Sequence, residues 1–221
     1  MTDPTLIIDL GVYLVTAEPA DDSTVSTVLA AVSGGVRIVQ LRDKAAGTDR
    51  LVELLQELHD QLAGSGTTLL VNDDVDAASA VPGVGIHLGP DDVHPTTARR
   101  QLGEAVCIGW SIHDLDQLSD HAALEASDYV AASPVWPTPT KTDTTRPWGL
   151  EGVRTLRSRV PAGVGLVGIG GISAANAADV IMAGADGVAV VSAICAAADP
   201  RTASQRLRST VDQARAQRVR S

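Results

Sequence analysis

The sequence predicts an α/β fold, a single-domain barrel of eight parallel strands alternating with helices, the (β/α)8 or TIM barrel. Three observations predict it: eight short apolar runs recur along the 221 residues, helical patterns separate most of them, and no linker or composition break divides the chain. An open, doubly wound sheet is the alternative fold. Eight similar units without interruption favour closure.

The apolar runs have the length of strands and are rich in Val, Leu, Ile and Ala. They are VYLVT (12–16), IVQL (38–41), TLLV (68–71), GIHLG (85–89), VCIGW (106–110), DYVAA (128–132), GLVGIG (165–170) and GVAVV (187–191). Such near-continuous runs are typical of parallel strands that are buried on both faces.

Helical patterns fill the connections between these runs. One helix shows the spacing of an apolar face at Leu51, Leu54, Leu55, Leu58 and Leu62. Ser23 and Ser173 precede two further helical patterns and are expected to be their N-caps, because glycines follow both segments. Short helices are expected within 74–84 and 92–103, and a final amphipathic helix after Pro200.

The composition limits the class of protein. Apolar residues make up 44% of the chain, Phe is absent and aromatic residues are 2%, so the core must consist of aliphatic side chains. The formal net charge of −10 argues against general nucleic-acid binding. No apolar run reaches membrane length. We expect one domain over residues 1–221, with loose ends at 1–10 and 217–221; the sequence leaves a homo-oligomer open.

The two cysteines, Cys107 and Cys195, lie in or beside apolar runs and have neither a CxxC nor a zinc-site spacing. Reduced core thiols are therefore expected, and with them a cytosolic location.

A barrel gathers its functional side chains where each strand ends. The second strand ends in QLRDK (40–44), and period-two alternation puts Gln40, Arg42 and Lys44 on one face, opposite Leu41 and Asp43. Two cations and an amide on one side of a strand end suit phosphate oxygens. A solvated strand end is the alternative, but a barrel interior is a poor place for unpaired cations.

Acidic side chains follow the next two strands. VNDD (71–74) and HLGPDD (87–92) bring Asn72, Asp73 and Asp92 to neighbouring strand ends. Two carboxylates beside an amide suit Mg²⁺, which completes its shell with water and phosphate. Either acidic pair alone is more often a helix cap, and Asp74 is expected to cap the helix that follows it. His87, within a strand, is expected to be structural.

Polar groups also follow the last four strands. The fifth strand ends in GWSIHD with Ser111 and His113, and the sixth in SPVWPTPTK (133–141), a stiff loop rich in donors. GIGGIS (168–173) and VVSAI (190–194) follow the last two strands, where barrels frequently bind a phosphate. The sequence thus predicts two anion sites, one with a metal at strands two to four and one formed by backbone amides at strands seven and eight.

Together, these motifs resemble the thiamine phosphate synthase family over nearly the whole chain, because QLRDK, VND, HLG-x-x-D, PVWPTPTK-x-D, GIGGI and VVSAI occur in the family's order. The resemblance implies an enzyme, a transferase that joins a hydroxymethylpyrimidine diphosphate to a thiazole phosphate with Mg²⁺ as cofactor and releases diphosphate. The partners it implies are these small molecules, with no nucleic acid and no membrane.

The resemblance also implies roles for individual residues. Those expected to bind the substrates are Tyr13, Gln40, Leu41, Arg42, Asp43, Lys44, Asn72, Ser111, Thr138, Pro139, Thr140, Lys141, Gly171, Val191 and Ser192. The catalytic residues among them would be Arg42, Lys44, Ser111 and Lys141, which act on the departing diphosphate. Asp73 and Asp92 would hold Mg²⁺.

The sequence departs from the family's usual pattern at Asp74, Pro90 and Ser133, all of which flank the expected site. Alternative functions are a thiazole tautomerase on the same barrel, a phosphate-binding barrel without catalysis, and a barrel with another phosphate substrate. The intact QLRDK and PTPTK motifs argue against the tautomerase, and both acidic metal positions argue against a barrel that only binds phosphate.

Overall fold

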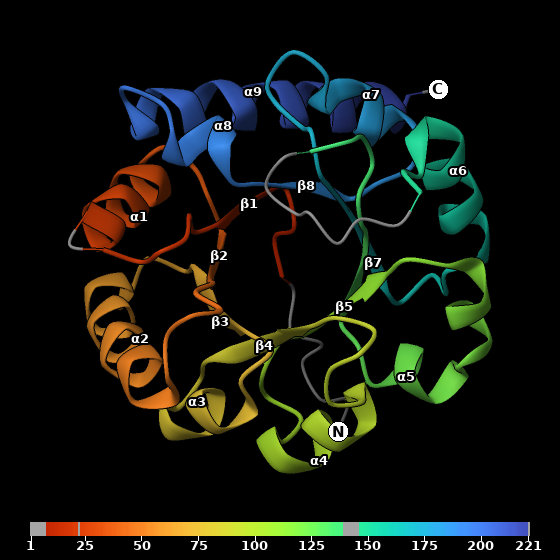
Figure 1. Ribbon diagram of the computed structural model, residues 1–221. Helices are drawn as coiled ribbons and strands as arrows, with labels where there is room; N and C mark the ends of the chain where they lie inside the picture. Colours follow the sequence, from red (N-terminus) through yellow and green to blue (C-terminus); the bar gives the residue numbers. More distant parts are fainter. Residues whose placement is uncertain (1–7, 22, 139–145, 221) are drawn as a thin grey trace.

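Eight parallel strands close into a barrel in the computed structural model, which describes residues 8–21, 23–138 and 146–220. Each strand pairs with its neighbour in sequence, and β1 pairs with β8 to close the ring (Figure 1). The strands are β1 (Val12–Val15), β2 (Ile38–Leu41), β3 (Thr68–Asn72), β4 (Gly85–Leu88), β5 (Ile108–Ile112), β6 (Tyr129–Ala132), β7 (Gly165–Ile169) and β8 (Gly187–Val190). The predicted fold class is confirmed.

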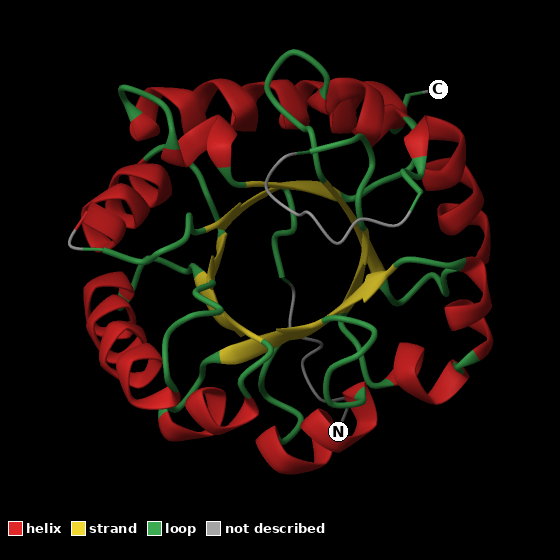
Figure 2. Cartoon of the chain, in the orientation of Figure 1, coloured by secondary structure: helices red, strands yellow, loops and turns green. Residues whose placement is uncertain are grey.

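Helices form an outer ring around the strands (Figure 2). They are α1 (Ser23–Ser33), α2 (Thr48–Leu62), α3 (Val75–Ala80), α4 (Pro95–Leu102), α5 (His121–Glu125), α6 (Gly149–Arg159), α7 (Ala177–Met182), α8 (Ser192–Cys195) and α9 (Pro200–Arg218), with a 3-10 helix at Leu115–Ser119. None of the helices in the described part of the chain is long and apolar enough to span a membrane.

Two local expectations need correction. The helix after β7 begins at Ala177, with Asn176 and not Ser173 at its N-cap position, because the Asn176 side chain accepts the Ser173 N–H at 2.8 Å and closes a turn first. The fifth strand runs two residues further than expected, to Ile112, so Ser111 belongs to the strand itself. The cap expected at Asp74 is confirmed, since its carboxylate accepts the Ala77 N–H at 2.8 Å.

The apolar core has two parts. The larger lies between the strands and the helices, and a smaller one fills the barrel interior around Tyr13, Ile38, Leu70 and Tyr129. Leu10 belongs to the inner core and packs against the beginning of β7 and β8. At Gly187 a Cβ atom would lie 1.6 Å from the Leu10 carbonyl oxygen, so this close approach requires a glycine. Both cysteines are free thiols.

The end of the barrel where the strands begin is held by charged clasps. In the first, the Asp128 carboxylate accepts the Ile108 N–H at 2.7 Å and the Arg99 guanidinium at 2.8 Å. Arg99 also donates to the Ala126 carbonyl at 3.1 Å and to the Val106 carbonyl at 2.7 Å. One arginine thereby ties the start of β6 to the loop that leads into β5.

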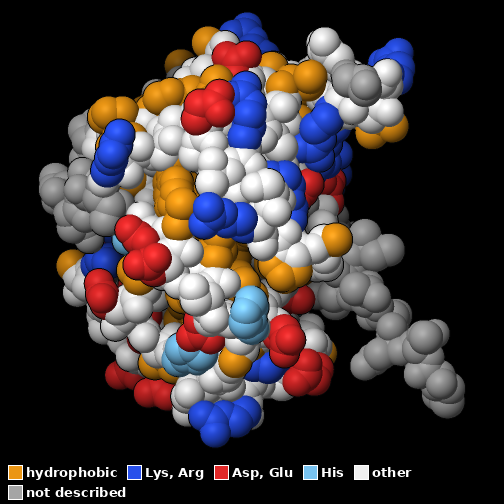
Figure 3. Space-filling model, turned by 90° about the vertical axis from the view of Figure 1, so that its right-hand side faces the viewer, with side chains coloured by type: hydrophobic (Ala, Val, Ile, Leu, Met, Phe, Trp, Pro, Cys, Tyr) orange, Lys and Arg blue, Asp and Glu red, His pale blue; other side chains and the backbone are white. Residues whose placement is uncertain are grey.

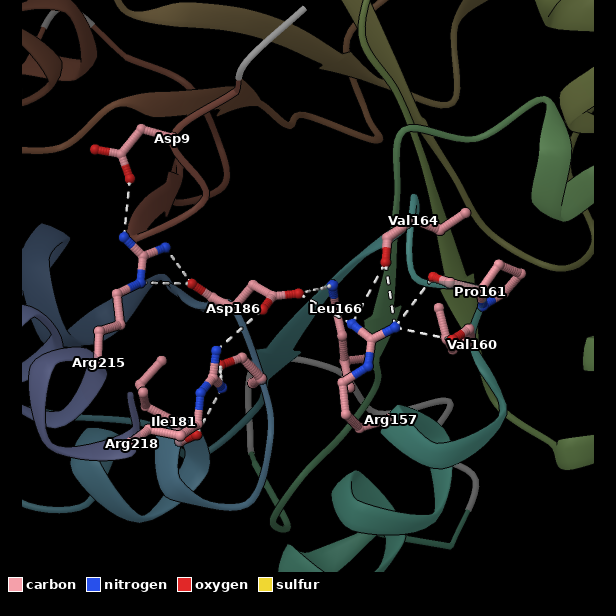
Figure 4. Close-up of polar contacts among 11 residues, drawn as sticks. Asp9, Arg157, Val160, Pro161, Val164, Leu166, Ile181, Asp186, Arg215 and Arg218 are labelled. Carbon is pink, nitrogen blue, oxygen red and sulfur yellow. Dashed lines mark hydrogen bonds and ion pairs between the residues drawn. The ribbon is translucent and has the colours of Figure 1, made fainter. Parts of the chain in front are cut away.

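The second clasp repeats this arrangement (Figure 4). The Asp186 carboxylate accepts the Leu166 N–H at 2.9 Å and the Arg157 guanidinium at 3.1 Å, and Arg218 of α9 pairs with it at 3.2 Å. In both clasps the arginine lies 29 residues before the aspartate in the sequence. The residue whose backbone N–H binds the aspartate lies 20 residues before it. Arg215 adds a bond to the Asp186 carbonyl oxygen at 2.9 Å.

The side of the barrel that carries α5 and α6 has a mixed surface (Figure 3). Basic, acidic and hydrophobic side chains interleave there, and no one type covers the whole face. Among the described residues, few large apolar side chains are exposed, and they belong to separate elements or loops. They are Val93, Met182 and Val219.

We expect Asp186→Ala to lower the free energy of unfolding by about 1–3 kcal/mol, the cost of leaving a buried donor without its partner. The substitution removes the acceptor of the Leu166 N–H and the partner of two arginines. Urea denaturation measures the effect. Asp60→Ala is the matched control, because its carboxylate is 85% exposed, and it should change stability by no more than about 0.5 kcal/mol. Equal losses in both variants would contradict the structural role of the clasp.

Candidate active site

A cavity of about 340 Å³ opens at the end of the barrel where the strands finish. All eight strands or the loops that follow them contribute to its wall. Nine of the residues predicted to bind substrate line it: Tyr13, Gln40, Arg42, Asn72, Ser111, Thr138, Gly171, Val191 and Ser192. Pro139, Thr140 and Lys141 lie outside the described residues.

Alternation along β2 decides which of its residues face the cavity. Gln40 and Arg42 line the wall, as predicted from the period of two. Leu41 is fully buried in the outer core, and Asp43 accepts the Ala20 N–H at 2.9 Å, so neither lies at the cavity. The side chains of both residues therefore lie away from the cavity.

Glu18, on the loop after β1, pairs with Arg42 and was not recognised in the sequence. Its carboxylate also accepts the backbone N–H of Lys44 at 2.6 Å. The Thr16 hydroxyl accepts the Arg42 N–H at 2.9 Å, so two residues of this loop hold the end of β2. No local pattern indicates this pairing, because 24 residues separate Glu18 from Arg42.

Three charged side chains meet beside the cavity, at the ends of β2, β3 and β4. Lys44 Nζ lies 3.7 Å from the Asp73 carboxylate, and the Asp92 carboxyl group is a close neighbour of Asp73. Burial, and then the neighbouring Asp92, raise the pKa of Asp73 to about 7, against the opposing effect of Lys44. Asn72, Asp73 and Asp92 therefore converge, as the sequence predicted.

The backbone of Asp73 is unusual. It has a φ of 62°, the only positive value among the described residues other than glycine. This left-handed conformation is uncommon outside glycine, although Asp tolerates it better than most residues. The Asp73 N–H donates to the His87 carbonyl at 2.9 Å, which joins the end of β3 to β4. Such outliers are held by surrounding structure and cluster at functional sites.

The two carboxylates fit a hard divalent cation. When both carboxyl groups are ionised they repel one another, and a bound cation would offset this repulsion. Mg²⁺ is commonly held by one or two carboxylates, with water and phosphate as its other ligands. The described residues contain no larger group of three or more His, Cys, Asp or Glu side chains that could hold a metal.

The opposite side of the cavity is made mainly of backbone. Gly170 and Gly171 have positive φ values of 100° and 66°, and at Gly171 a Cβ atom would lie 2.9 Å from the Trp136 side chain. Val191 and Ser192 stand at the start of the short helix α8. Glycine-rich backbone beside the first turn of a helix exposes N–H groups and can bind an anion.

The loop after β6 forms one rim of the cavity through Ser133, Pro134, Pro137 and Thr138. It is fastened to β7 by the Val135 N–H, which donates to the Ile169 carbonyl at 2.7 Å. The rim therefore stands between the two polar sides, as the position of this loop in the sequence suggested.

His87, which was expected to be structural, also lines the cavity. Its Nε2 lies 2.9 Å from the Ser111 hydroxyl, and its Nδ1 lies 2.9 Å from the Tyr129 hydroxyl. The sequence could have indicated this role, because the alternation of side chains along β4 points His87 into the barrel. A polar side chain on that face needs partners from other strands.

The fold and this cavity define a class, the (β/α)8-barrel enzymes that bind small molecules at the carboxyl ends of their strands. The mouth combines an arginine, a pair of carboxylates and a glycine-rich backbone, which suits phosphorylated ligands and a divalent cation.

Comparison with known proteins identifies the family. Residues 12–194 match the family model described as thiamine monophosphate synthase. The thiamine-phosphate synthase of Albidiferax ferrireducens is 47% identical over 205 residues, covering 92% of each chain, and that of Chloroflexus aurantiacus is 42% identical over 207 residues, covering 93% of this chain and 94% of its own. The thiamine phosphate pyrophosphorylase of Pyrococcus furiosus superposes with a TM-score of 0.82 at 33% identity and covers 94% of this chain and 98% of its own. The chain belongs to the thiamine monophosphate synthase family, and it is a transferase.

We expect stability to depend on pH through Asp73. Its folded pKa is raised above its ordinary value, so its contribution is complete below about pH 4 and is lost as the pH rises through 7. Asp92→Asn removes the like charge but keeps an acceptor for the Gly89 N–H. In EDTA, this variant should therefore melt about 2–4 °C above the wild type at pH 8, the shift typical of 1 kcal/mol in a domain of this size.

At pH 5 the melting temperatures of the wild type and Asp92→Asn should agree closely, because the wild-type pair then carries a proton. Differential scanning calorimetry at the two pH values provides the measurement. A variant that is less stable than the wild type at pH 8 would show that Asp92 does not repel Asp73.

Proposed function

We propose that this chain is a thiamine phosphate synthase, which joins a hydroxymethylpyrimidine diphosphate to a thiazole phosphate and releases diphosphate. The observation that carries the proposal is the two-sided cavity, with Gln40, Arg42 and Asn72 on one side and Gly171 and Ser192 on the other. A reaction between two phosphorylated molecules needs two anion-binding ends that face a common centre. The similarity to named synthases over more than nine tenths of the chain supports the same reaction.

The diphosphate end is proposed to lie beside β2 and β3. Arg42 can offer two parallel N–H groups to a phosphate, and Asn72 and Ser111 add neutral donors. Lys44 lies 3.7 Å from Asp73 and brings a second cation to this side. These positive groups would stabilise the charge that develops on the departing diphosphate. Lys141 is proposed to join them.

Asp73 and Asp92 are proposed to hold Mg²⁺ at the same end. The raised pKa of Asp73 supports a pair of carboxylates that is short of positive charge. When bound, the metal would neutralise part of the diphosphate charge and so help it to leave. Because both carboxylates must lose their protons to bind a cation, its affinity should rise with pH through 7.

The thiazole phosphate is proposed to lie at the opposite end. The backbone of Gly171 and Val191 and the hydroxyls of Ser192, Thr138 and Thr140 supply donors without a charge of their own. Holding this phosphate would keep the thiazole nitrogen close to the pyrimidine methylene carbon. Tyr13 and Gln40 also line the cavity and are proposed to contact the pyrimidine.

The proposed reaction is dissociative. The bond between the methylene carbon and the diphosphate oxygen breaks first, and both electrons leave with the diphosphate. The electron-rich aminopyrimidine supports the resulting cation, and the thiazole nitrogen then donates its lone pair to the methylene carbon. The chain therefore needs no nucleophile of its own. The free thiols of Cys107 and Cys195 support a cytosolic location for this chemistry.

Incubation of the purified protein with both substrates and Mg²⁺ tests the function. Mass spectrometry should detect thiamine phosphate, and diphosphate should appear in equal amount. Omission of either substrate should abolish both products. A protein that rearranged the thiazole alone, or bound both phosphates without joining them, would overturn the proposal.

A matched pair of variants tests the assignment of the two ends. Arg42→Lys should lower kcat by on the order of 10-fold or more, because a point charge cannot replace a guanidinium that binds two oxygens. The KM of the thiazole phosphate should hardly change in this variant. Ser192→Ala should raise that KM by several-fold and leave the pyrimidine diphosphate unaffected, since one neutral hydrogen bond contributes about 1 kcal/mol.

Steady-state kinetics with each substrate varied in turn separates these effects. Each variant is the control for the other. If both variants weakened the same substrate, the two ends of the cavity would be wrongly assigned.

A further inference from the structure

A continuous chain of buried hydrogen bonds crosses the barrel interior below the cavity. Gln40 Nε2 lies 2.5 Å from the Tyr13 hydroxyl, which lies 2.9 Å from the Tyr129 hydroxyl. The Tyr129 hydroxyl lies 2.9 Å from His87 Nδ1, and His87 Nε2 lies 2.9 Å from the Ser111 hydroxyl. The five side chains come from β2, β1, β6, β4 and β5, and all are buried.

The protons that each side chain can donate determine the direction of this series of hydrogen bonds. The Gln40 amide nitrogen can only donate, so the Tyr13 oxygen accepts. Among the described residues, the remaining partner of the Tyr13 hydroxyl is Tyr129, which therefore receives the Tyr13 proton. Burial raises the pKa of both phenols, so each keeps its proton and must donate it.

The same argument determines which groups donate between Tyr129 and Ser111. Having accepted from Tyr13, the Tyr129 hydroxyl donates to His87 Nδ1. A neutral imidazole whose Nδ1 accepts carries its proton on Nε2, so His87 donates to the Ser111 oxygen. The Ser111 proton is then not used by His87, and Ser111 lines the cavity.

We propose that Tyr129 is a positioning residue that fixes the His87 proton on Nε2 and so presents the Ser111 hydroxyl as a donor to an oxygen anion in the cavity. The inference rests on the proposed function only for the identity of that anion, an oxygen of the departing diphosphate. With the opposite direction, Ser111 would donate to His87 and turn a lone pair toward the anion. The direction therefore decides whether Ser111 attracts or repels the ligand.

The packing of Tyr129 fits this role. Its side chain is fully buried and does not line the cavity, so it acts through His87. Its ring meets Tyr13 edge-on at 5.9 Å and stacks on His87 at 5.7 Å, which fixes both partners. At Gly109 a Cβ atom would lie 2.1 Å from the Tyr129 ring, so β5 leaves room for the phenol only by having glycine there.

Nuclear magnetic resonance of the substrate-free protein labelled with 15N-histidine tests the direction without any assay of function. The His87 signal, assigned by its loss in His87→Asn, should show the proton on Nε2 in the wild type. Ser111→Ala should keep this tautomer, because Tyr129 still donates to Nδ1. Tyr129→Phe should move a substantial fraction of the protein to the Nδ1 tautomer. A proton on Nδ1 in the wild type, or an unchanged tautomer in Tyr129→Phe, would overturn the proposal.

A double-mutant cycle tests the consequence for catalysis. Ser111→Ala should lower kcat by about 100-fold, the usual effect of removing one donor to an oxyanion, and Tyr129→Phe by about 10-fold. In the Ser111→Ala background, the Tyr129→Phe change should have almost no further effect, because both act on one hydroxyl. Fully additive losses would assign Tyr129 a structural role and overturn the proposal.

Circular dichroism of each variant shows whether it folds. If Tyr129→Phe fails to fold, the wild-type and Ser111→Ala tautomers still decide the direction. If the protein made no thiamine phosphate at all, the proposed function would fail, and the tautomer measurement would stand by itself.

Discussion

Closure of the barrel is the constraint on which the rest of the structure depends. Because β1 pairs with β8, no strand has a free edge, and the strands are buried on both faces. A polar side chain inside such a ring must find a partner on another strand or reach the open end. The interior meets this requirement with one connected series of hydrogen bonds that ends at Ser111, and the charged Arg42 lies where the cavity opens.

The charges at the mouth are arranged to neutralise one another in the absence of ligand. Arg42 pairs with Glu18 and Lys44 with Asp73, and burial and the neighbouring Asp92 raise the pKa of Asp73 to about 7. The proposed diphosphate, together with a divalent cation, would carry both signs of charge and could replace these internal partners. A local concentration of positive charge would allow a chain with a net charge of −10 to receive the proposed anionic substrate.

The parts of the fold that were predictable from the sequence depend on local repetition. Alternation placed Gln40 and Arg42 on the cavity side, and apolar runs located all eight strands. Alternation also argued against Leu41 and Asp43, which the resemblance had added and which the structure places elsewhere. The family resemblance was most useful at the strand ends, because single polar residues there follow no periodic pattern from which their role could be predicted.

What could not be predicted depends on contacts between distant residues or on competition within a turn. Glu18 meets Arg42 only after the barrel has formed, and His87 gains its partners from β5 and β6. Ser173 was expected to cap the helix after β7, but the Asn176 side chain accepts the Ser173 N–H and the helix begins only at Ala177. The series of hydrogen bonds inside the barrel can be recognised only from atomic positions, because no spacing in the sequence links Tyr13 to Tyr129.

The two clasps at the other end of the barrel also bear on how the chain reaches its fold. Each joins an arginine to an aspartate only 29 residues later, so each closes a short loop at a modest entropic cost. The pairing of Val12 with Val188, by contrast, must bring together the two ends of the chain. Local contacts form before such distant ones. We therefore expect the half of the barrel from α4 to β8 to assemble as two clasped units before β1 pairs with β8, with Leu10 packing against the start of β7 and β8.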